Sequence, residues 1–247
     1  MTTRSDPSRR KSRRDLMLGL GGLVAVAAGW QVFGVREGRL SFVPLPGVDG
    51  WQLAETSAIT AAGGSAAGAV LAGIGETRVA PLAVSALCEA LYQSDAAGVP
   101  VAVFSDFFCP NCRTLDARLA RRSDLAITWH QLPLLGPSSE AMAWALMAAD
   151  VQGGYAAMRD ELLTRPFRPG PRMYREAASD AGLDAVRLLA DIEGADVGQR
   201  LTQTAAAAER LAVWGTPAFT IGRTLVMGSV SEAQIDRLVD MHRESAC

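Results

Sequence analysis

The feature that most constrains this 247-residue chain is a pair of closely spaced cysteines directly after a short apolar segment. The segment Val99 to Phe104 is rich in β-branched residues, which predicts a buried strand. The sequence Cys109-Pro110-Asn111-Cys112 follows, and after it Leu115 and Leu119 lie four residues apart, as on one face of a helix. The two cysteines are therefore expected between the end of a strand and the start of the helix that follows it.

The position of Cys109 at the start of a helix predicts its chemistry. The first turn of a helix offers unpaired N–H groups and the positive end of the helix dipole, and both stabilise a thiolate over a thiol. We therefore expect Cys109 to be an exposed thiol of low pKa, suited to be the attacking or leaving sulfur. Pro110 suits the first helical turn, because its missing N–H would find no partner there. Cys112, about one turn further, is expected to be buried and close enough to form a disulfide with Cys109.

Two other interpretations of the cysteine pair were weighed. A zinc site would need two further ligands, usually a second closely spaced pair of Cys or His. The remaining candidates are not paired at such a spacing: Cys88, His130, His242 and Cys247. A permanent disulfide over so short a loop would add little stability. Redox chemistry is therefore favoured, with no metal and no cofactor beyond a redox-active Cys109–Cys112 disulfide.

A second signal lies far downstream, at Gly215-Thr216-Pro217 before the apolar segment Ala218 to Ile221. A proline at the head of a strand, after a glycine, is a place where a cis X–Pro bond is used. Taken alone, a trans proline that starts a strand would be the simpler interpretation. Together with the cysteine pair, the motif predicts a cis bond between Thr216 and Pro217, with the proline packed against the two sulfurs.

These motifs, in this order, resemble the thioredoxin fold. More narrowly they resemble the DsbA-like thiol:disulfide oxidoreductases of the bacterial periplasm. Phe104 to Cys112 is similar to the active-site segment of that family, and Gly215 to Pro217 is similar to its cis-proline loop. Leu132 to Glu140, followed by the alanine-rich Ala141 to Ala149, is similar to the entry of the family's helical insertion. The resemblance covers about residues 99–243.

The resemblance implies an α/β protein with a thioredoxin fold and a helical insertion. It implies that Cys109 forms the mixed disulfide with the substrate and that Cys112 resolves it. It also implies that the cis-proline loop pairs with the backbone of an extended substrate peptide, as strand addition permits. The residues expected to bind substrate are Pro110, Asn111, Thr216 and Pro217.

Two departures from the family pattern bear on the direction of electron flow. The best-known oxidants of the family carry His where this chain has Asn111, and an uncharged Asn stabilises a thiolate less. Thr216 before the loop proline, and Ser105-Asp106 before the cysteines, are closer to the isomerase-like relatives. An oxidant is favoured, and a reductase or isomerase is the first alternative.

The charges are unevenly distributed along the chain. Residues 1–14 carry six basic residues and one acidic residue, so the chain's net charge of −2 leaves −7 for the rest. An acidic body argues against nucleic-acid partners. Leu16 to Val35 contains no charge and is about as long as a bilayer span, so the N-terminus is an export signal or a membrane anchor. Ser12 to Met17 resembles a twin-arginine signal.

We therefore expect the protein in the bacterial periplasm, anchored in the inner membrane by residues 16–35. The alternative is export and cleavage, by the twin-arginine route. Either location is oxidising and gives a dithiol access to secreted substrates. The expected parts are a signal or anchor in residues 1–36, an N-terminal extension and linker in 37–80, and a DsbA-like thioredoxin domain in 81–247 whose helical insertion covers about 138–213.

Smaller elements are expected within these parts. Short strands are predicted at Leu40 to Val43 and Trp51 to Ala54, and a helix over Pro81 to Tyr92. Cys88, within that helix, is expected to be a buried or half-buried small apolar residue.

The predicted function is that of an envelope thiol:disulfide oxidoreductase acting on exported proteins that contain cysteines. A membrane protein or a thioredoxin-like protein would be its redox partner. A different class stays open as the second alternative, in which an anchored assembly factor or copper chaperone uses the dithiol without catalysis.

Overall fold

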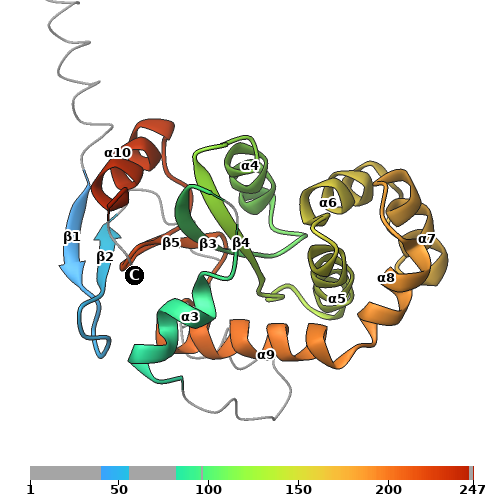
Figure 1. The fold of residues 1–247 in the computed structure, drawn as a ribbon, viewed down its shortest axis with the longest axis horizontal. Helices are drawn as coiled ribbons and strands as arrows, with labels where there is room; N and C mark the ends of the chain where they lie inside the picture. The colour runs from blue at the N-terminus through green and yellow to red at the C-terminus, as the bar shows by residue number, and fades with distance from the viewer. Residues whose placement is uncertain (1–39, 56–81, 96, 245–246) are drawn as a thin grey trace, which may run out of the picture.

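In the part of the chain that the structure describes, six strands form one mixed sheet with the order β1-β2-β6-β5-β3-β4 (Figure 1). The strands are β1 (Ser41–Pro44), β2 (Gln52–Glu55), β3 (Val99–Ser105), β4 (Leu125–Gln131), β5 (Ala218–Ile221) and β6 (Thr224–Met227). β3 pairs parallel with β4 and antiparallel with β5, with Phe104 opposite Ala218. This pairing brings the end of β3, which leads to the cysteines, beside the start of β5, which follows Pro217.

The computed structural model describes residues 40–55, 82–95, 97–244 and 247. The predicted signal or anchor in residues 1–36, with its apolar segment 16–35, lies outside these ranges, as does most of the linker. Within the described ranges, no helix combines the length and apolar composition that a bilayer span requires.

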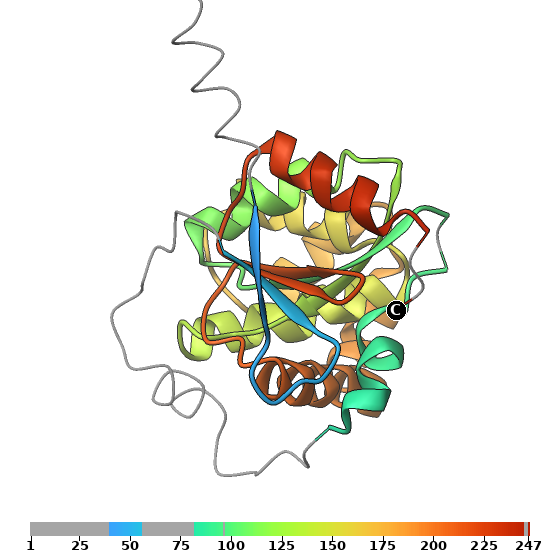
Figure 2. The same ribbon diagram turned by 90° about the vertical axis from the view of Figure 1, so that its left-hand side faces the viewer.

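Helices cover both faces of the sheet and extend beyond one edge (Figures 1 and 2). The helices are α3 (Leu87–Leu91), α4 (Pro110–Leu119), α5 (Pro137–Val151), α6 (Tyr155–Thr164), α7 (Pro171–Asp180), α8 (Ala185–Ile192), α9 (Ala195–Arg210) and α10 (Glu232–His242). α4 and α10 lie over one face, whereas α3 and α9 lie over the other. The chain therefore has the α/β layers of a thioredoxin fold.

The alternation of side chains along β3 explains the two layers. Val101 and Val103 belong to the core shared with α4 and α10, and both are fully buried. Ala102 and Phe104 point to the opposite face and belong to the core shared with α3 and α9. Because successive residues of a strand face opposite sides, a strand buried on both faces is apolar throughout.

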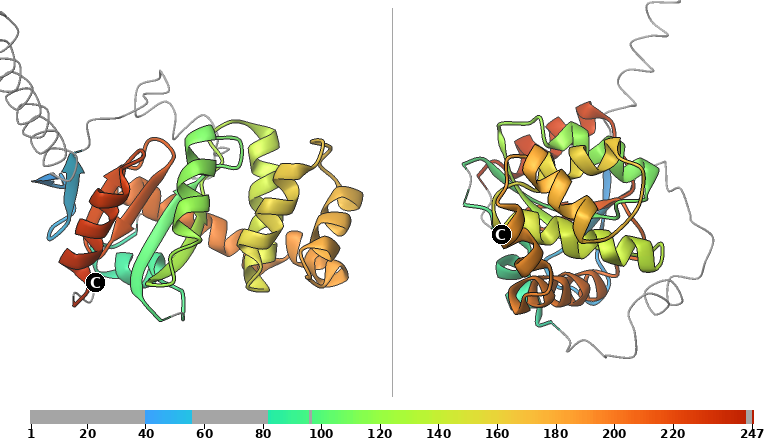
Figure 3. Two further views of the ribbon diagram at one scale, coloured as in Figure 1. Left: turned by 90° about the horizontal axis from the view of Figure 1, so that it is seen from above. Right: turned by 90° about the vertical axis from the view of Figure 1, so that its right-hand side faces the viewer.

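The helical insertion between β4 and β5 consists of α5 to α9. Figure 3 shows α5 to α8 packed beside the sheet, with α9 running back beneath it. The start of α8 follows from its sequence, since the Asp184 side chain accepts hydrogen bonds from the N–H groups of Val186 and Arg187. The sequence predicts helices over 138–150, 154–163, 172–181, 184–192 and 197–213, and each observed helix begins and ends within three residues of these bounds.

The N-terminal extension contributes to the sheet, which the sequence did not indicate. β2 pairs parallel with β6, with Gln52 opposite Thr224, and β1 pairs antiparallel with β2. Each of these strands begins one residue after its predicted start. The helix predicted over Pro81 to Tyr92 is shorter than expected: a 3-10 turn spans Val84–Ala86 and α3 ends at Leu91.

Cys88 is not the simple apolar residue that was expected. It forms a disulfide with Cys247, which lies 159 positions later in the sequence. The bond fastens the last residue of the chain to α3. Cys88 is half-buried, as predicted, but its disulfide was not predicted, because the residue's helical surroundings contain no sign of a partner so distant in the sequence.

Removing this disulfide is expected to destabilise the fold. A disulfide typically stabilises a fold by about 2–4 kcal/mol, chiefly by restricting the unfolded chain, and we expect the middle of that range for this bond. For Cys88→Ala we expect a melting temperature lowered by about 6–12 °C. Scanning calorimetry of the oxidised protein measures this. Cys247→Ala should give the same loss and the double variant no further loss, since all three lack one bond. Unchanged melting temperatures in both single variants would contradict the prediction.

Candidate active site

Cys109 and Cys112 lie at the N-terminus of α4, directly after β3, as the sequence predicts. Cys109 is the N-cap residue, and its Sγ accepts a hydrogen bond from the backbone N–H of Cys112 at 3.3 Å. Pro110 is the first residue of the helix. Both cysteines are free thiols. Cys112 is fully buried, but Cys109 is only 7% exposed, so the expectation of an openly exposed Cys109 was wrong.

The cis-proline loop lies against the first cysteine. The Thr216–Pro217 bond is cis, which confirms the prediction. Cys109 Sγ donates a hydrogen bond to the carbonyl oxygen of Thr216 at 3.4 Å. Pro217 is buried, and its own carbonyl accepts the N–H of Gly228 at 2.8 Å. The sheet thus places the two sequence motifs in direct contact.

The surroundings of the two sulfurs separate their pKa values. The pKa of Cys109 is lowered to about 6, mainly by the hydrogen bond from the Cys112 thiol. Burial of Cys109 opposes this, and backbone N–H groups of Cys112 and Asn111 add to the lowering. Burial raises the pKa of Cys112 far above its ordinary value. At neutral pH the reduced protein therefore has a thiolate at Cys109 and a thiol at Cys112.

Alkylation of the reduced protein should report this difference. With a pKa of about 6, about nine-tenths of Cys109 is thiolate at pH 7, against a few per cent of an unperturbed cysteine. We expect Cys109 to react with iodoacetamide with a midpoint near pH 6, and Cys112 to stay protected. Peptide mass spectrometry from pH 4 to 9 measures both.

The Cys112→Ala variant is the control for the cause of the shift. It removes the main hydrogen bond to the Cys109 thiolate, so the midpoint should move to higher pH. Labelling of Cys112 before Cys109, or a wild-type midpoint above pH 8, would refute this electrostatic account.

Comparison with known families agrees with this geometry. A family model described as the DSBA-like thioredoxin domain matches residues 100–240, more than half of the chain. The chain belongs to the DsbA-like thioredoxin family. Members of this family are thiol:disulfide oxidoreductases, and residues 100–240 form an α/β thioredoxin domain of that class.

Solved structures share the fold. A thioredoxin-like oxidoreductase from Silicibacter pomeroyi DSS-3 is 29% identical with a TM-score of 0.52, covering 64% of this chain and 98% of its own. The catalytic domain of Proteus mirabilis ScsC is 22% identical with a TM-score of 0.53, and the match covers 64% of this chain and 96% of that domain. The thiol-disulfide exchange protein alpha-DsbA2 from Wolbachia pipientis is 20% identical with a TM-score of 0.54, covering 64% and 92%. At these identities, the last two show the fold alone.

One curated relative matches this chain over only part of its own length. The Na(+)/H(+) antiporter NhaA 3 of Salinispora tropica is 33% identical over 134 residues, which cover 51% of this chain and 20% of the antiporter. The match therefore spans only about a fifth of that relative's length, so the antiporter's activity is not carried over to this chain.

In this DsbA-like protein, Asp106 organises the loop before the cysteines, a role that the sequence did not reveal. The carboxylate is 1% exposed and accepts four hydrogen bonds. Its Oδ1 accepts the N–H of Phe108 at 2.9 Å and the Ser139 hydroxyl at 2.8 Å. Its Oδ2 accepts the N–H groups of Leu134 and Leu135 at 2.8 and 3.1 Å. Asp106 thus ties the active-site loop to the start of the helical insertion.

An aromatic cluster borders the same loop. The Phe108 ring, next to Cys109 in the chain, lies edge-on against Phe107 and Phe167, at 5.1 and 4.7 Å. Phe167 belongs to the connection between α6 and α7 and is 41% exposed. Leu135, whose N–H reaches Asp106, is 53% exposed. The insertion therefore supplies exposed apolar side chains beside the loop that carries Cys109.

Within the described ranges, no group of three or more His, Cys, Asp or Glu side chains is placed to hold a metal ion. His130 serves the structure, with its ring nitrogens 3.0 Å from Thr204 Oγ1 and 2.9 Å from the Leu91 carbonyl oxygen.

Proposed function

We propose that this protein is an envelope thiol:disulfide oxidoreductase that oxidises cysteine pairs of exported proteins through Cys109 and Cys112. The observation that carries the proposal is the Cys109 sulfur at the N-cap of α4, with its pKa lowered to about 6. Stabilising the thiolate stabilises the reduced form of the pair, so the disulfide form is a stronger oxidant.

The proposed reaction transfers two electrons from the substrate to the cysteine pair. A substrate thiolate attacks Sγ of Cys109 in the disulfide, forming a mixed disulfide and releasing Cys112, which takes up a proton. The second substrate thiolate then attacks the substrate sulfur of the mixed disulfide. A substrate disulfide forms and Cys109 leaves as a thiolate. A sulfur of low pKa leaves faster, so the environment of Cys109 favours this direction.

The residues around Cys109 fit an extended substrate. Pro110 and Asn111 are exposed at the start of α4, and Thr216 is half-buried next to the sulfur. We assign these residues and Pro217 to substrate binding, with the loop backbone pairing with the peptide as an added strand. The exposed Phe167 and Leu135 would contact apolar side chains of unfolded clients.

The proposed location is the bacterial periplasm, with residues 16–35 as the inner-membrane anchor. The basic residues followed by an uncharged apolar segment support export. The Cys88–Cys247 disulfide supports an oxidising compartment, where such bonds persist. The proposed parts are the anchor in 1–36, the N-terminal extension and linker in 37–80, and the catalytic domain in 81–247. Strands β1 and β2 of the extension add to the sheet of the catalytic domain. A membrane or thioredoxin-like protein would reoxidise the cysteine pair.

The redox potential of the pair tests the proposed direction. We expect a value above about −200 mV in glutathione buffers, towards the −120 mV of strong oxidants and away from the −270 mV of thioredoxin. Thiol trapping in the native host should find Cys109 and Cys112 oxidised. A value near −270 mV with a reduced pair would support the reductase or isomerase instead. Stoichiometric Cu(I) binding without disulfide exchange activity would support the copper chaperone.

A further inference from the structure

A buried carboxylate lies behind the active-site helix and has no part in the exchange reaction described above. Asp116 follows Cys112 by four residues on α4, so the two share a helix face. Asp116 is 2% exposed, and its Oδ2 accepts a hydrogen bond from the Ser105 hydroxyl at 2.6 Å. Its Oδ1 is buried without a hydrogen-bond partner. A buried carboxylate of this kind needs a compensating charge.

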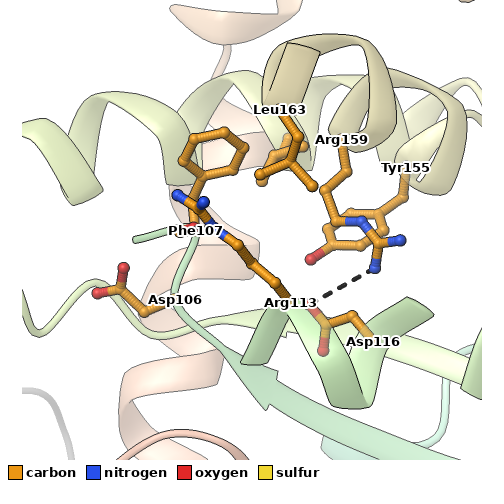
Figure 4. Close-up of a pocket in the computed structure, with 8 residues that line it drawn as sticks. Asp106, Phe107, Arg113, Asp116, Tyr155, Arg159 and Leu163 are labelled. Atoms are coloured by element: carbon orange, nitrogen blue, oxygen red, sulfur yellow. Dashed lines mark hydrogen bonds and ion pairs between the residues drawn. The ribbon is translucent and has the colours of Figure 1, made fainter. Parts of the chain in front are cut away.

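The compensating charge comes from the helical insertion. Arg159 of α6 is 4% exposed, and its Nη1 lies 3.7 Å from Asp116 Oδ2. Figure 4 shows the guanidinium pointing from α6 towards the Asp116 carboxylate on α4. Its Nε and Nη2 donate to Asp160 Oδ1 at 3.2 and 2.8 Å, whereas Nη1 has no hydrogen-bond partner.

Asp116 and Arg159 both line one small cavity. Its volume is about 10 Å³, which is about what one bridging water requires. The other polar side chains lining it are already engaged. Tyr155 accepts the Gln131 amide at 2.6 Å, and Arg113 donates to the Phe107 carbonyl at 3.2 Å. The carboxylate of Asp106, as described above, is saturated by four donors.

We propose that the buried Asp116–Arg159 pair, which joins the active-site helix to the helical insertion, sets the reduction potential of the Cys109–Cys112 pair. Arg159 is then a positioning residue: it holds a charge on Asp116 and touches neither substrate nor sulfur. This inference rests on the proposed redox role of the two cysteines.

The electrostatics of the cluster support the coupling. Burial raises the pKa of Asp116 to about 6, the Ser105 hydroxyl and Arg159 lower it, and the Cys109 thiolate raises it. Such an interaction is reciprocal, so an ionised Asp116 destabilises the Cys109 thiolate by the same free energy. Both groups lie in a poorly solvated interior, where screening by water is weak. The charge at Asp116, balanced by Arg159, therefore bears on the stability of the reduced state.

The test is the equilibrium of the protein with glutathione, in which oxidised protein and two glutathione thiols give reduced protein and glutathione disulfide. Asp116→Asn removes the negative charge and leaves Arg159 positive, so the thiolate is favoured. We expect the equilibrium constant to rise about tenfold towards reduced protein, which corresponds to about 30 mV for a two-electron couple. The alkylation midpoint of Cys109 should fall in parallel.

Two further variants separate charge from structure. In Asp116→Asn/Arg159→Gln neither charge remains, so its equilibrium constant should lie between those of wild type and Asp116→Asn. This variant leaves no unpaired buried charge. If Asp116→Asn alone folds poorly, the equilibrium constant of the double variant should still exceed that of wild type. Asp150→Asn is the matched control. Asp150 also pairs with an arginine, since Arg200 Nη1 lies 2.9 Å from its Oδ2, and it lies near the C-terminal end of α5, whereas Ser139 lies near the N-terminal end. Its equilibrium constant should equal that of wild type.

The outcomes distinguish this inference from the proposed function. A wild-type protein whose Cys109–Cys112 pair forms no reversible disulfide with glutathione would overturn the proposed function. If wild type forms its disulfide reversibly, and Asp116→Asn and the double variant both have the equilibrium constant of wild type, only the role of the buried pair is overturned. An equal shift in Asp150→Asn would also overturn it, since the effect would then not depend on this cluster.

Discussion

Replacing Cys109 with Ser is expected to lower the rate of disulfide transfer to a reduced peptide by at least about 10³-fold. The reacting species is a thiolate, and a serine hydroxyl at the same N-cap does not ionise at neutral pH. Serine is itself a preferred N-cap residue, so α4 and the stability of the fold should be preserved. A fluorescent dithiol peptide monitors the transfer, and circular dichroism checks the fold.

Cys112→Ala is the companion variant. The Cys109 thiolate of this variant can attack a disulfide of an oxidised client, which forms a mixed disulfide and releases a client thiolate, but Cys112 is absent and cannot attack Cys109 to release the client. We expect mixed disulfides with client proteins to accumulate and to be visible on non-reducing gels. Exchange activity retained in Cys109→Ser, or mixed disulfides formed through Cys112, would show that the roles of the two cysteines have been assigned the wrong way round.

The largest expected effect on stability is that of Asp106→Ala. The change leaves three backbone N–H groups and the Ser139 hydroxyl without their acceptor in a buried place. Each buried donor left unsatisfied costs about 1–3 kcal/mol, partly recovered where water enters, so we expect a loss of about 4 kcal/mol. The melting temperature should fall by about 8–16 °C.

Two variants check the cause of this loss. Asp106→Asn keeps one of the two oxygens and should lose about half as much stability. Asp184→Ala is the exposed counterpart: its carboxylate also accepts two backbone N–H groups, at the start of α8, and its loss should cost about 1 kcal/mol. Equal losses in Asp106→Ala and Asp184→Ala, measured by urea denaturation, would show that burial of Asp106 contributes nothing.

The local chemistry of the site was predictable from short stretches of sequence. A proline after Cys109 suits the first turn of a helix, because its ring fixes the backbone and its missing N–H is not needed there. The strand before it is apolar from Val99 to Phe104, so it was recognisable as buried. The insertion helices could be placed because signals such as Asp184 are read within one turn.

The features that were missed depend on partners distant in the sequence. Cys88 and Cys247 lie 159 positions apart, and four cysteines allow three pairings between which sequence alone does not choose. Likewise, the sequence shows Asp106 only as a polar residue in an apolar stretch. Its role as an acceptor is visible only once Leu134, Leu135 and Ser139 are folded against it. A clue to the buried Asp116 was available, since it lies four residues after Cys112 and next to the buried Leu115.

The sequence by itself therefore determined the elements of this protein: a strand, a helix that begins with Pro110, a cis-proline loop and a helical insertion. The strand and the helix follow from backbone geometry and from side-chain periodicity, which act over a few residues, whereas the cis-proline loop and the insertion were expected from the resemblance of their motifs to the DsbA-like family. Only the tertiary structure decided how the cysteine pair is tuned, through the Thr216 carbonyl at Cys109, the complete burial of Cys112 and the pairing of Asp116 with Arg159. The physical reason is that the pKa of a sulfur depends on burial and on nearby donors and charges, and here segments far apart in the chain supply them.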